Sequence, residues 1–385
     1  MMRGETGQNR MHWTGDRRHG IAGRRANAWL LWPAMILMVL LSTGFGPYLT
    51  TSDLNGYRLS HEQALELTAM LAGPVPDAAA AILYDVDANQ VLYQHNAHER
   101  RAPASTTKIA TAMVVLQRAA LEQAVTVGSE VEVEGMRIGL AAGDQATVEK
   151  LLYALLMNSG NDAAMALAMA VGGTHAQFTL WMNELVAGMG LENTHFVNPY
   201  GWDAEGHYSS AYDLVMLARA ALENPIFADI VATSQTSFDG WTFTSTNELL
   251  GVYPGVDGVK TGTTDEAGQC LVASATRGGH RVILVVMGAD DRYADATTLL
   301  DFYYDHYVWQ QLDLPANWFT ALEPTEEGRR RYLTLEQPID QLLARWQLPW
   351  LRAEWTVDAE SNEGTARFGI GDIDLMQVPF IIKVL

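Results

Sequence analysis

The alternation of hydrophobic and polar residues predicts two separate groups of β-strands. Residues 79–96 carry β-branched and aromatic runs on either side of Asp87-Ala88-Asn89, a pattern typical of a β-hairpin. Further strand-like runs cover 258–264, 269–277 and 280–288, and Gly278-Gly279 forms the predicted turn between the last two. We expect an antiparallel sheet built from these two distant parts of the chain.

Helical periodicity fills the chain before, between and after these strands. The predicted helices cover 53–75, 105–123, most of 147–224, and 295–312. The order of strands, helices, strands and a final helix indicates an α+β fold. In this fold a sheet is backed by terminal helices and carries a helical insert.

Beyond Pro315 the pattern changes to short alternating segments separated by Gly and Asp. The strand-like runs are 331–335, 353–357, 366–370 and 378–385. We therefore predict three parts: an N-terminal segment 1–52, a main domain 53–312 and a small β domain 316–385.

The N-terminal segment combines a basic stretch with an apolar one. Residues 1–27 contain six arginines and two acidic residues, and 26–52 contain no charged residue. This is the form of a signal peptide or an uncleaved signal anchor. No A-x-A cleavage pattern follows the apolar run, which favours the anchor, whereas a buried soluble helix would leave the arginines unexplained. We expect the protein to be exported and to act at the outer face of the cytoplasmic membrane, in the periplasm or outside the cell.

Composition narrows the function classes. The chain has 385 residues, of which 48% are hydrophobic and 18% charged, so it can bury a large core. The net charge of −20 argues against nucleic-acid binding, because an acidic protein repels the phosphate backbone. The single cysteine, Cys270, cannot form an intramolecular disulfide and is interpreted as a small buried hydrophobic residue.

The chain has only four lysines (Lys108, Lys150, Lys260 and Lys383), so their positions are informative. Lys108 follows Ser105 by three residues near a predicted helix start, and this spacing places its amine beside the hydroxyl. A serine becomes a good nucleophile when a nearby base takes its proton. A lysine made neutral by burial or by a second cation can be that base. Taken alone, the pair also fits a helix N-terminus with a surface lysine.

Two other motifs have a chemical and an ordinary interpretation. Ser159 and Asn161 lie at a break between helical runs, where they could relay a proton and bind a carbonyl, or simply cap a helix. Lys260, Thr261 and Gly262 lie on a predicted strand, where Lys260 could be the second cation and Gly262 would let an extended peptide approach. The ordinary interpretation of the last motif is a strand flanked by turns.

In chain order the motifs are Ser-x-x-Lys, then Ser-x-Asn 54 residues later, then Lys-Thr-Gly 101 residues further on. This is the ordered triplet of penicilloyl serine transferases. With the surrounding segments RAPASTTKIATAMVVL, LLYALLMNSGNDAAMALA, NPYGWDAEGHYSSAYDLVMLARAAL and GVDGVKTGTTDEAGQCLVASATRGGHRVILVVMG, the chain closely resembles the serine-type D-Ala-D-Ala carboxypeptidases. These are the low-molecular-mass penicillin-binding proteins, and the resemblance covers about residues 55–310.

The resemblance implies a penicillin-binding-protein/β-lactamase-like transpeptidase fold, with an antiparallel sheet, flanking helices and a helical subdomain, followed by a small all-β domain. It also implies that Ser105 attacks the carbonyl between the last two D-alanines of a peptidoglycan stem peptide, with Lys108 as the base. Ser159 and Lys260 would pass the proton to the departing D-Ala.

The remaining roles concern substrate binding and also come from the resemblance. Asn161 would orient the substrate amide, and Thr261 and Lys260 would hold its carboxylate, with Gly262 on the same strand. The backbone N–H groups of Ser105 and Thr263 would form the oxyanion hole. β-Lactams are expected to be covalent inhibitors, and no metal or organic cofactor is implied.

The chain departs from the family pattern in two places. The segment STNELLGVYPGVDG before the Lys-Thr-Gly strand lacks a recognisable basic residue that some relatives use to hold the substrate carboxylate. The β-like C-terminal region shows no amphipathic anchor, so an N-terminal anchor would replace it.

The sequence leaves four functions to consider, three enzymatic and one non-catalytic. Carboxypeptidase activity is favoured, and a DD-endopeptidase that cuts cross-links would use the same motifs. A class A β-lactamase is disfavoured because no E-x-x-L-N segment lies between Asn161 and Lys260. A non-catalytic module that binds β-lactams or the cell wall is disfavoured because every motif residue is present.

Overall fold

The computed structural model describes residues 59–69, 71, 73–74, 76–312, 328–329, 331–335, 337, 339–357 and 363–384. The predicted signal or anchor within 1–52 lies outside these residues. Among the described residues, no helix is both long enough and apolar enough to cross a bilayer.

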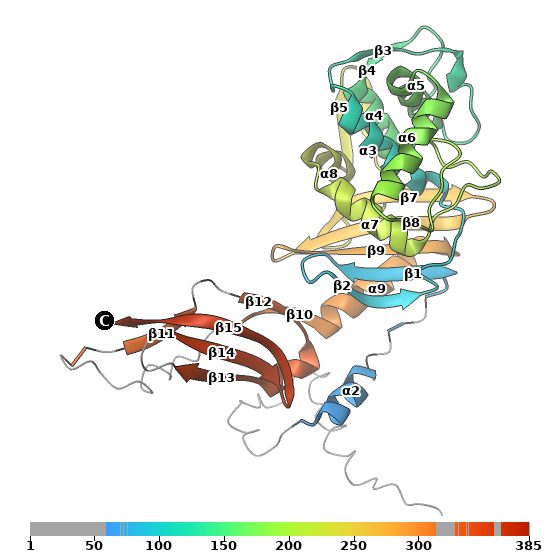
Figure 1. Cartoon of the computed structure of the whole chain (residues 1–385). Helices are drawn as coiled ribbons and strands as arrows, with labels where there is room; N and C mark the ends of the chain where they lie inside the picture. Colours follow the sequence, from blue (N-terminus) through green and yellow to red (C-terminus); the bar gives the residue numbers. More distant parts are fainter. Residues whose placement is uncertain are drawn as a thin grey trace, which may run out of the picture. The chain divides into compact units, whose positions relative to one another are not determined.

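The two predicted strand groups join in one five-stranded sheet with the order β2-β1-β9-β8-β7 (Figure 1). Every neighbouring pair is antiparallel. The strands are β1 (Ala80–Asp85), β2 (Gln90–His95), β7 (Val256–Thr264), β8 (Gly268–Arg277) and β9 (His280–Ala289). The N-terminal hairpin therefore pairs directly with β9, about 200 residues later in the chain.

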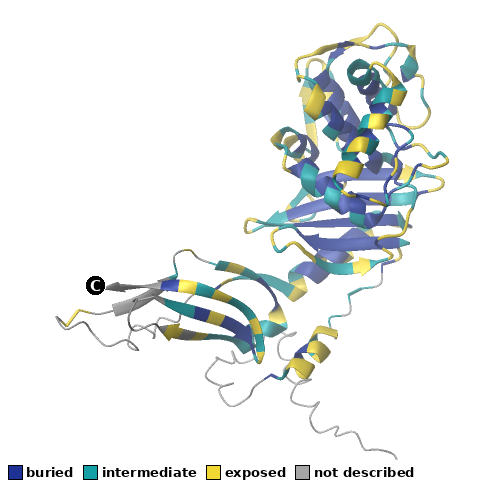
Figure 2. Cartoon of the chain, viewed as in Figure 1, coloured by how far each residue is buried: buried dark blue, intermediate teal, exposed yellow. Residues whose placement is uncertain are grey.

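Both faces of the sheet are buried, as Figure 2 shows for its central strands. Ile82 and Val285 belong to the hydrophobic core on the helical side, whereas their neighbours Leu83 and Leu284 belong to the core on the α9 side. This alternation follows from the two-residue period of a strand. It explains why the strand sequences are almost continuously apolar.

Helices cover each face. On one side α7 packs on β9 and α8 packs on β7, and on the other side α9 packs on β8 and β9 (Figure 1). Side chains of Thr147, Ser210 and Asp291 accept backbone N–H bonds at the starts of α4, α7 and α9. The helices are α2 (His61–Ala69), α3 (Lys108–Arg118), α4 (Val148–Leu156), α5 (Asn161–Gly172), α6 (His175–Gly188), α7 (Ala211–Leu222), α8 (Pro225–Ala232) and α9 (Arg292–His306).

Short elements connect the helices. Two small two-stranded antiparallel sheets are formed by β3 (Ala124–Thr126) with β4 (Gln145–Thr147) and by β5 (Gln235–Phe238) with β6 (Trp241–Thr244). Two 3₁₀ turns are η1 (Ala104–Thr107) and η2 (Ser129–Val131).

Within the described residues, the runs predicted as strands beyond Pro315 are strands. They form a four-stranded antiparallel sheet in the order β11-β15-β14-β13, and β10 pairs with β12. Their bounds are β10 (Tyr307–Leu312), β11 (Arg331–Leu335), β12 (Ile339–Ala344), η4 (Arg345–Trp350), β13 (Leu351–Val357), β14 (Glu363–Ile370) and β15 (Ile373–Val384). The division into domains 53–312 and 316–385 stays a prediction.

Three helix predictions were wrong in extent. Within the described residues, the helix predicted over 53–75 covers only His61–Ala69. The helix predicted over 105–123 begins as η1 and ends at Arg118, and the helix predicted over 295–312 ends at His306. Residues Tyr307–Leu312 form β10 because they pair with β12, which begins 27 residues further along the chain. Their aromatic and β-branched residues suit a strand once this partner is present. The helical stretch predicted over 147–224 is interrupted between α6 and α7 by the irregular segment 189–210.

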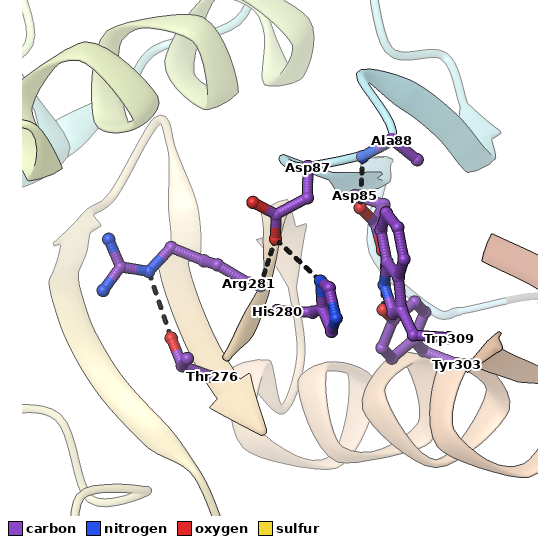
Figure 3. Close-up of polar contacts among 8 residues, drawn as sticks. All are labelled: Asp85, Asp87, Ala88, Thr276, His280, Arg281, Tyr303 and Trp309. Atoms are coloured by element: carbon purple, nitrogen blue, oxygen red, sulfur yellow. Dashed lines mark hydrogen bonds and ion pairs between the residues drawn. The ribbon is translucent and has the colours of Figure 1, made fainter. Parts of the chain in front are cut away.

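The buried carboxylate of Asp85 joins three parts of the fold (Figure 3). Its Oδ1 accepts from the Ala88 backbone N–H at 2.8 Å, which closes the β1–β2 turn. Its Oδ2 accepts from the Tyr303 hydroxyl of α9 at 2.6 Å and from Trp309 Nε1 of β10 at 3.1 Å. Asp85 thus links the first hairpin to the last helix and to the strand that follows it.

Replacing Asp85 by Ala leaves these three donors without their charged acceptor, so we expect the free energy of unfolding to fall by about 3 kcal/mol. Thermal unfolding measures this loss. Asp87→Ala is the matched control, because Asp87 lies in the same turn but its side chain is 42% exposed. We expect that variant to lose about 1 kcal/mol or less. Equal losses in the two variants would contradict a central role for Asp85.

Candidate active site

Ser105 lies in η1, directly before α3, and is partly exposed. The preceding residue, Ala104, has a positive φ of 48°. Two glycines crowd this turn: a Cβ on Gly201 would lie 1.8 Å from the Ala104 carbonyl oxygen, and one on Gly262 would lie 2.9 Å from the Ser105 nitrogen. The nucleophile candidate is therefore held between the 198–202 loop and β7 at positions that only glycine fits.

Lys108, the first residue of α3, is fully buried beside Ser105. Its Nζ lies 2.8 Å from Ser105 Oγ, 2.7 Å from Asn161 Oδ1 and 2.7 Å from the Tyr200 carbonyl oxygen. The last two atoms can only accept hydrogen bonds, so they take two N–H groups of the lysine. A neutral amine then has its lone pair left for the proton of the Ser105 hydroxyl.

The surroundings of Lys108 favour this neutral amine. Burial is the main cause that holds the pKa of Lys108 well below its ordinary value of 10.5. The positive charge of Lys260 lowers the pKa further, and the carboxylate of Asp162 opposes the shift. A neutral Lys108 beside the Ser105 hydroxyl has the position and the charge state that a base for this serine needs.

Asn161, at the start of α5, is held by hydrogen bonds to the loop that contains Glu134 and Met136. Its Nδ2 donates to the Glu134 carbonyl at 2.6 Å, and its backbone N–H donates to the Met136 carbonyl at 2.7 Å. Because Nδ2 faces Glu134, Oδ1 faces Lys108. The loop thus sets the direction of the amide that contacts the Lys108 amine.

Asp162, which the sequence analysis missed, holds the same loop. This carboxylate is fully buried and accepts backbone N–H bonds from Ile138, Gly139 and Leu140 at 3.1, 2.9 and 3.0 Å. An aspartate in the first turn of a helix often binds backbone N–H groups, so its position was the available signal. Its loop partners could not be read from the sequence.

Ser159 lies in the turn between α4 and α5, with a positive φ of 60° and 6% exposure. Within the described part of the chain its hydroxyl has no hydrogen-bond partner. The structure therefore places Ser159 at the predicted break between helices but does not bond it to Ser105 or Lys108.

Lys260 is the second buried lysine of the site, at 1% exposure on β7. Its Nζ donates to the Thr261 carbonyl at 3.0 Å. Burial, followed by the positive charge of Arg292, lowers the pKa of Lys260 to about 7. Lys260 is thus able to change charge near neutral pH.

Arg292, another residue the sequence analysis missed, lies against the outer end of the Lys-Thr-Gly motif. Its Nη1 donates to the Gly262 carbonyl at 2.8 Å, and its Nη2 donates to the exposed Thr263 hydroxyl. Asp291, a good helix-capping residue after a strand, signals that Arg292 begins a helix. Only the strand order of the folded sheet reveals that this helix starts beside β7.

A buried histidine supports the turn that carries Ser105. The Val197 N–H donates to His207 Nδ1 at 2.9 Å, so the ring proton is on Nε2, which donates to Thr107 Oγ1 at 2.9 Å. Burial is the main cause that lowers the pKa of His207 to about 4. His207 is therefore a neutral structural group near pH 7, and no sequence pattern identified it.

Two further findings complete the geometry. Within the described residues, no group of three or more His, Cys, Asp or Glu side chains could hold a metal ion. Cys270 is buried, as predicted.

Comparison with known proteins identifies the family of the chain. Residues 69–291 match the peptidase S11 family, the D-alanyl-D-alanine carboxypeptidases. The D-alanyl-D-alanine carboxypeptidase DacF of Bacillus subtilis is 37% identical over 285 residues, 69% of this chain and 72% of the relative. DacA of Escherichia coli is 31% identical over 352 residues, 84% of this chain and 87% of the relative.

Solved structures give the same result. Penicillin binding protein 6B from Escherichia coli superimposes with a TM-score of 0.65 and 32% identity, and the match covers 80% of this chain and 95% of that one. The Streptomyces K15 DD-transpeptidase matches with a TM-score of 0.57 and 34% identity, over 60% of this chain and 98% of that one.

The chain therefore belongs to the peptidase S11 family of D-alanyl-D-alanine carboxypeptidases. The predicted family, the serine-peptidase class and the α+β penicillin-binding-protein fold are confirmed.

The fit of Gly262 against the Ser105 turn predicts a loss of activity without a loss of fold. In Gly262→Ala the new Cβ lies 2.9 Å from the Ser105 nitrogen and 3.0 Å from the Ala104 Cβ, so the turn must shift. We expect D-Ala release to fall about 100-fold or more, because a small misplacement of a reacting group has effects of this size.

Gly188→Ala is the control, since no atom lies within 4 Å of the Cβ it adds. We expect this variant to keep wild-type activity, and both variants to show cooperative thermal unfolding. Near-normal D-Ala release by Gly262→Ala would show that the turn tolerates displacement.

Proposed function

We propose that the protein is an extracytoplasmic serine DD-carboxypeptidase that removes the terminal D-Ala from peptidoglycan stem pentapeptides through an acyl-enzyme on Ser105. The observation that carries the proposal is the 2.8 Å contact between Lys108 Nζ and Ser105 Oγ. Because the other two partners of Nζ only accept, the neutral amine is oriented to take the serine proton.

In the acylation step the Ser105 Oγ bonds to the carbonyl carbon between the two D-alanines while its proton passes to Lys108. The carbonyl oxygen becomes negative, and the backbone N–H groups of Ser105 and Thr263 stabilise it. The C–N bond then breaks, and the departing D-Ala amine receives a proton passed through Ser159 and Lys260. Among the described residues the Ser159 hydroxyl has no competing hydrogen-bond partner, and its part in this path comes from the family resemblance.

The terminal carboxylate of the substrate binds beside β7. Thr261 and charged Lys260 hold it, as the family resemblance implies, and Arg292 adds a guanidinium that already contacts the Thr263 hydroxyl. Arg292 thus supplies a positive charge for the carboxylate, although the segment before β7 lacks the basic residue found there in some relatives.

Asn161 keeps a free donor for the substrate. Its Nδ2 has two hydrogens, and the Glu134 carbonyl takes one of them. The other is available for a carbonyl of the peptide, which would orient the substrate amide while Oδ1 holds Lys108.

Water releases the acyl group in the second half of the cycle, with the same amine accepting a proton from the water. A β-lactam would acylate Ser105 in the same way. Its leaving nitrogen stays attached to the acyl group, so the adduct persists and inhibits the enzyme.

The location is proposed from the N-terminal sequence. A basic stretch followed by an uncharged apolar run is a signal for export, so we place the catalytic residues outside the cytoplasmic membrane and the basic tail inside. The N-terminal segment would attach the protein to the membrane, and residues 316–385 would form a separate small β domain.

The nucleophile is tested by mass spectrometry of the intact full chain after addition of benzylpenicillin. We expect a lasting adduct on the wild type and none on Ser105→Ala, because the alanine has no oxygen to acylate. Ser237→Ala, which removes an exposed hydroxyl on β5, should acylate like the wild type.

An adduct on Ser105→Ala would refute the nucleophile assignment. Release of D-Ala from a stem pentapeptide, with a cross-linked peptide dimer left intact, is expected for the wild type. Cleavage of the dimer alone would identify an endopeptidase.

The two lysines predict a bell-shaped pH profile for acylation. The rate should rise with pH as Lys108 loses its proton, because only the neutral amine accepts the serine proton. It should fall above about 7, where Lys260 loses the charge that binds the carboxylate. A profile that rises only near 10.5, the ordinary lysine value, would contradict the assignment of Lys108 as the base.

Lys260→Met separates the two limbs of this profile. Removing the Lys260 charge removes one cause of the lowered Lys108 pKa, so the acid limb should move to higher pH. The alkaline limb near pH 7 should disappear. Lys150→Met is the control, because Lys150 is buried elsewhere against Asp239 and should leave both midpoints unchanged.

A further inference from the structure

Thr246 makes the only side-chain hydrogen bond that the described residues give to the hydroxyl of Thr261. The two Oγ1 atoms are 2.6 Å apart, and the pair is partly buried. Thr246 belongs to the segment 245–255 between β6 and β7, which contains no Lys or Arg. Its hydroxyl lies directly behind the residue that binds the substrate carboxylate in the proposed function.

The backbone of Thr246 is fixed from two sides. Its N–H donates to the carbonyl of Met157, at the end of α4, at 3.1 Å. Its carbonyl accepts from the hydroxyl of Tyr293, in the first turn of α9, at 2.7 Å. These bonds hold Thr246 between the segment that leads to Ser159 and the helix that carries Arg292.

The next residue fixes the same segment to β7. Asn247 is buried, and its Nδ2 donates to the Gly258 carbonyl at 2.9 Å. Thr246 is therefore held relative to α4, α9 and β7, and its side chain has a defined direction. Such fixation is typical of a residue that positions a binding group.

The chemistry of the two hydroxyls determines which one donates when substrate is bound. A carboxylate only accepts hydrogen bonds, so Thr261 must give it its single O–H proton. The Thr261 oxygen can then only accept from Thr246, and Thr246 must be the donor. In the free enzyme either hydroxyl can donate this hydrogen bond, whereas in the complex with substrate only Thr246 can donate it.

We propose that Thr246 is a positioning residue for the substrate carboxylate: its hydroxyl donates to Thr261 and directs the Thr261 proton toward the ligand. This inference rests on the carboxylate-binding role of Thr261 in the proposed function. It assigns a specificity role to a residue that lies outside the three sequence motifs.

The test compares a ligand that has the carboxylate with one in which it is masked. The second-order rate constants for acylation by benzylpenicillin and by its methyl ester are measured with the full chain. Thr246→Val keeps the shape and the backbone bonds but removes the donor, so the preference for the free acid should fall about tenfold. Thr246→Ser keeps the hydroxyl and should keep the preference.

Peptide kinetics give a second readout. For a peptide that ends in D-Ala-D-Ala, Thr246→Val should raise KM about tenfold and leave kcat within about twofold of wild type, because binding of the carboxylate is lost in the ground state as well as in the transition state. Thr242→Val is the matched control. It removes one hydroxyl of the exposed Ser237–Thr242 pair, 3.0 Å apart in the β5–β6 hairpin, and should change neither quantity.

The outcomes separate this inference from the proposed function. A wild type that does not distinguish the acid from the ester would refute the carboxylate role of Thr261 itself. A wild type that does distinguish them, with Thr246→Val showing the same preference, would refute the role of Thr246 alone. Equal losses for acid and ester would also refute it, since they would indicate a general effect on the turn.

Discussion

The structure depends on one constraint: a lysine side chain is buried with no carboxylate bonded to it. The three atoms around Lys108 Nζ belong to a hydroxyl, an amide and a backbone carbonyl. Asp162, the carboxylate whose charge acts on Lys108, is instead hydrogen-bonded to backbone N–H groups of the 138–140 loop. An unpaired buried charge costs several kcal/mol, so the surroundings favour the neutral amine. In the proposed mechanism this amine takes the proton of the Ser105 hydroxyl.

The rest of the fold supports this arrangement from distant parts of the chain. Gly201 and Gly262 let a loop and β7 close on the Ser105 turn, and the sheet brings β7 to that position. Lys260 on β7 is under the same constraint, because it is buried and its bonded partner is a backbone carbonyl. Lys150 shows the usual alternative, because it is also buried but pairs with Asp239 at 2.8 Å. Lys108 and Lys260 therefore differ from Lys150 in that neither has a carboxylate bonded to its amine among the described residues.

The sequence predicted the parts of the site that depend on short-range geometry. Ser105 and Lys108 are three residues apart on one helical turn, so their contact follows from local structure. The roles of Tyr200 and Arg292 could not be predicted in this way: one contributes a backbone carbonyl, which has no side-chain signature, and the other reaches β7 only through the strand order. The same limit explains the wrong helix over 307–312, which is a strand because of a distant partner. Local periodicity predicted the hairpins and most helices. The strand at 307–312 and the contacts of Tyr200 and Arg292 depend on pairing between distant parts of the chain, which periodicity does not show.

The protonation of Lys108 can be measured directly because the chain contains only four lysines. Nuclear magnetic resonance of the full chain with isotope-labelled lysine side chains, assigned with Lys150→Met and Lys260→Met variants, would follow each amine as pH is raised. The account predicts that Lys108 loses its proton well below the ordinary 10.5 and that Lys260 does so near 7. A Lys108 amine that stays charged up to the ordinary lysine value would contradict its role as the base.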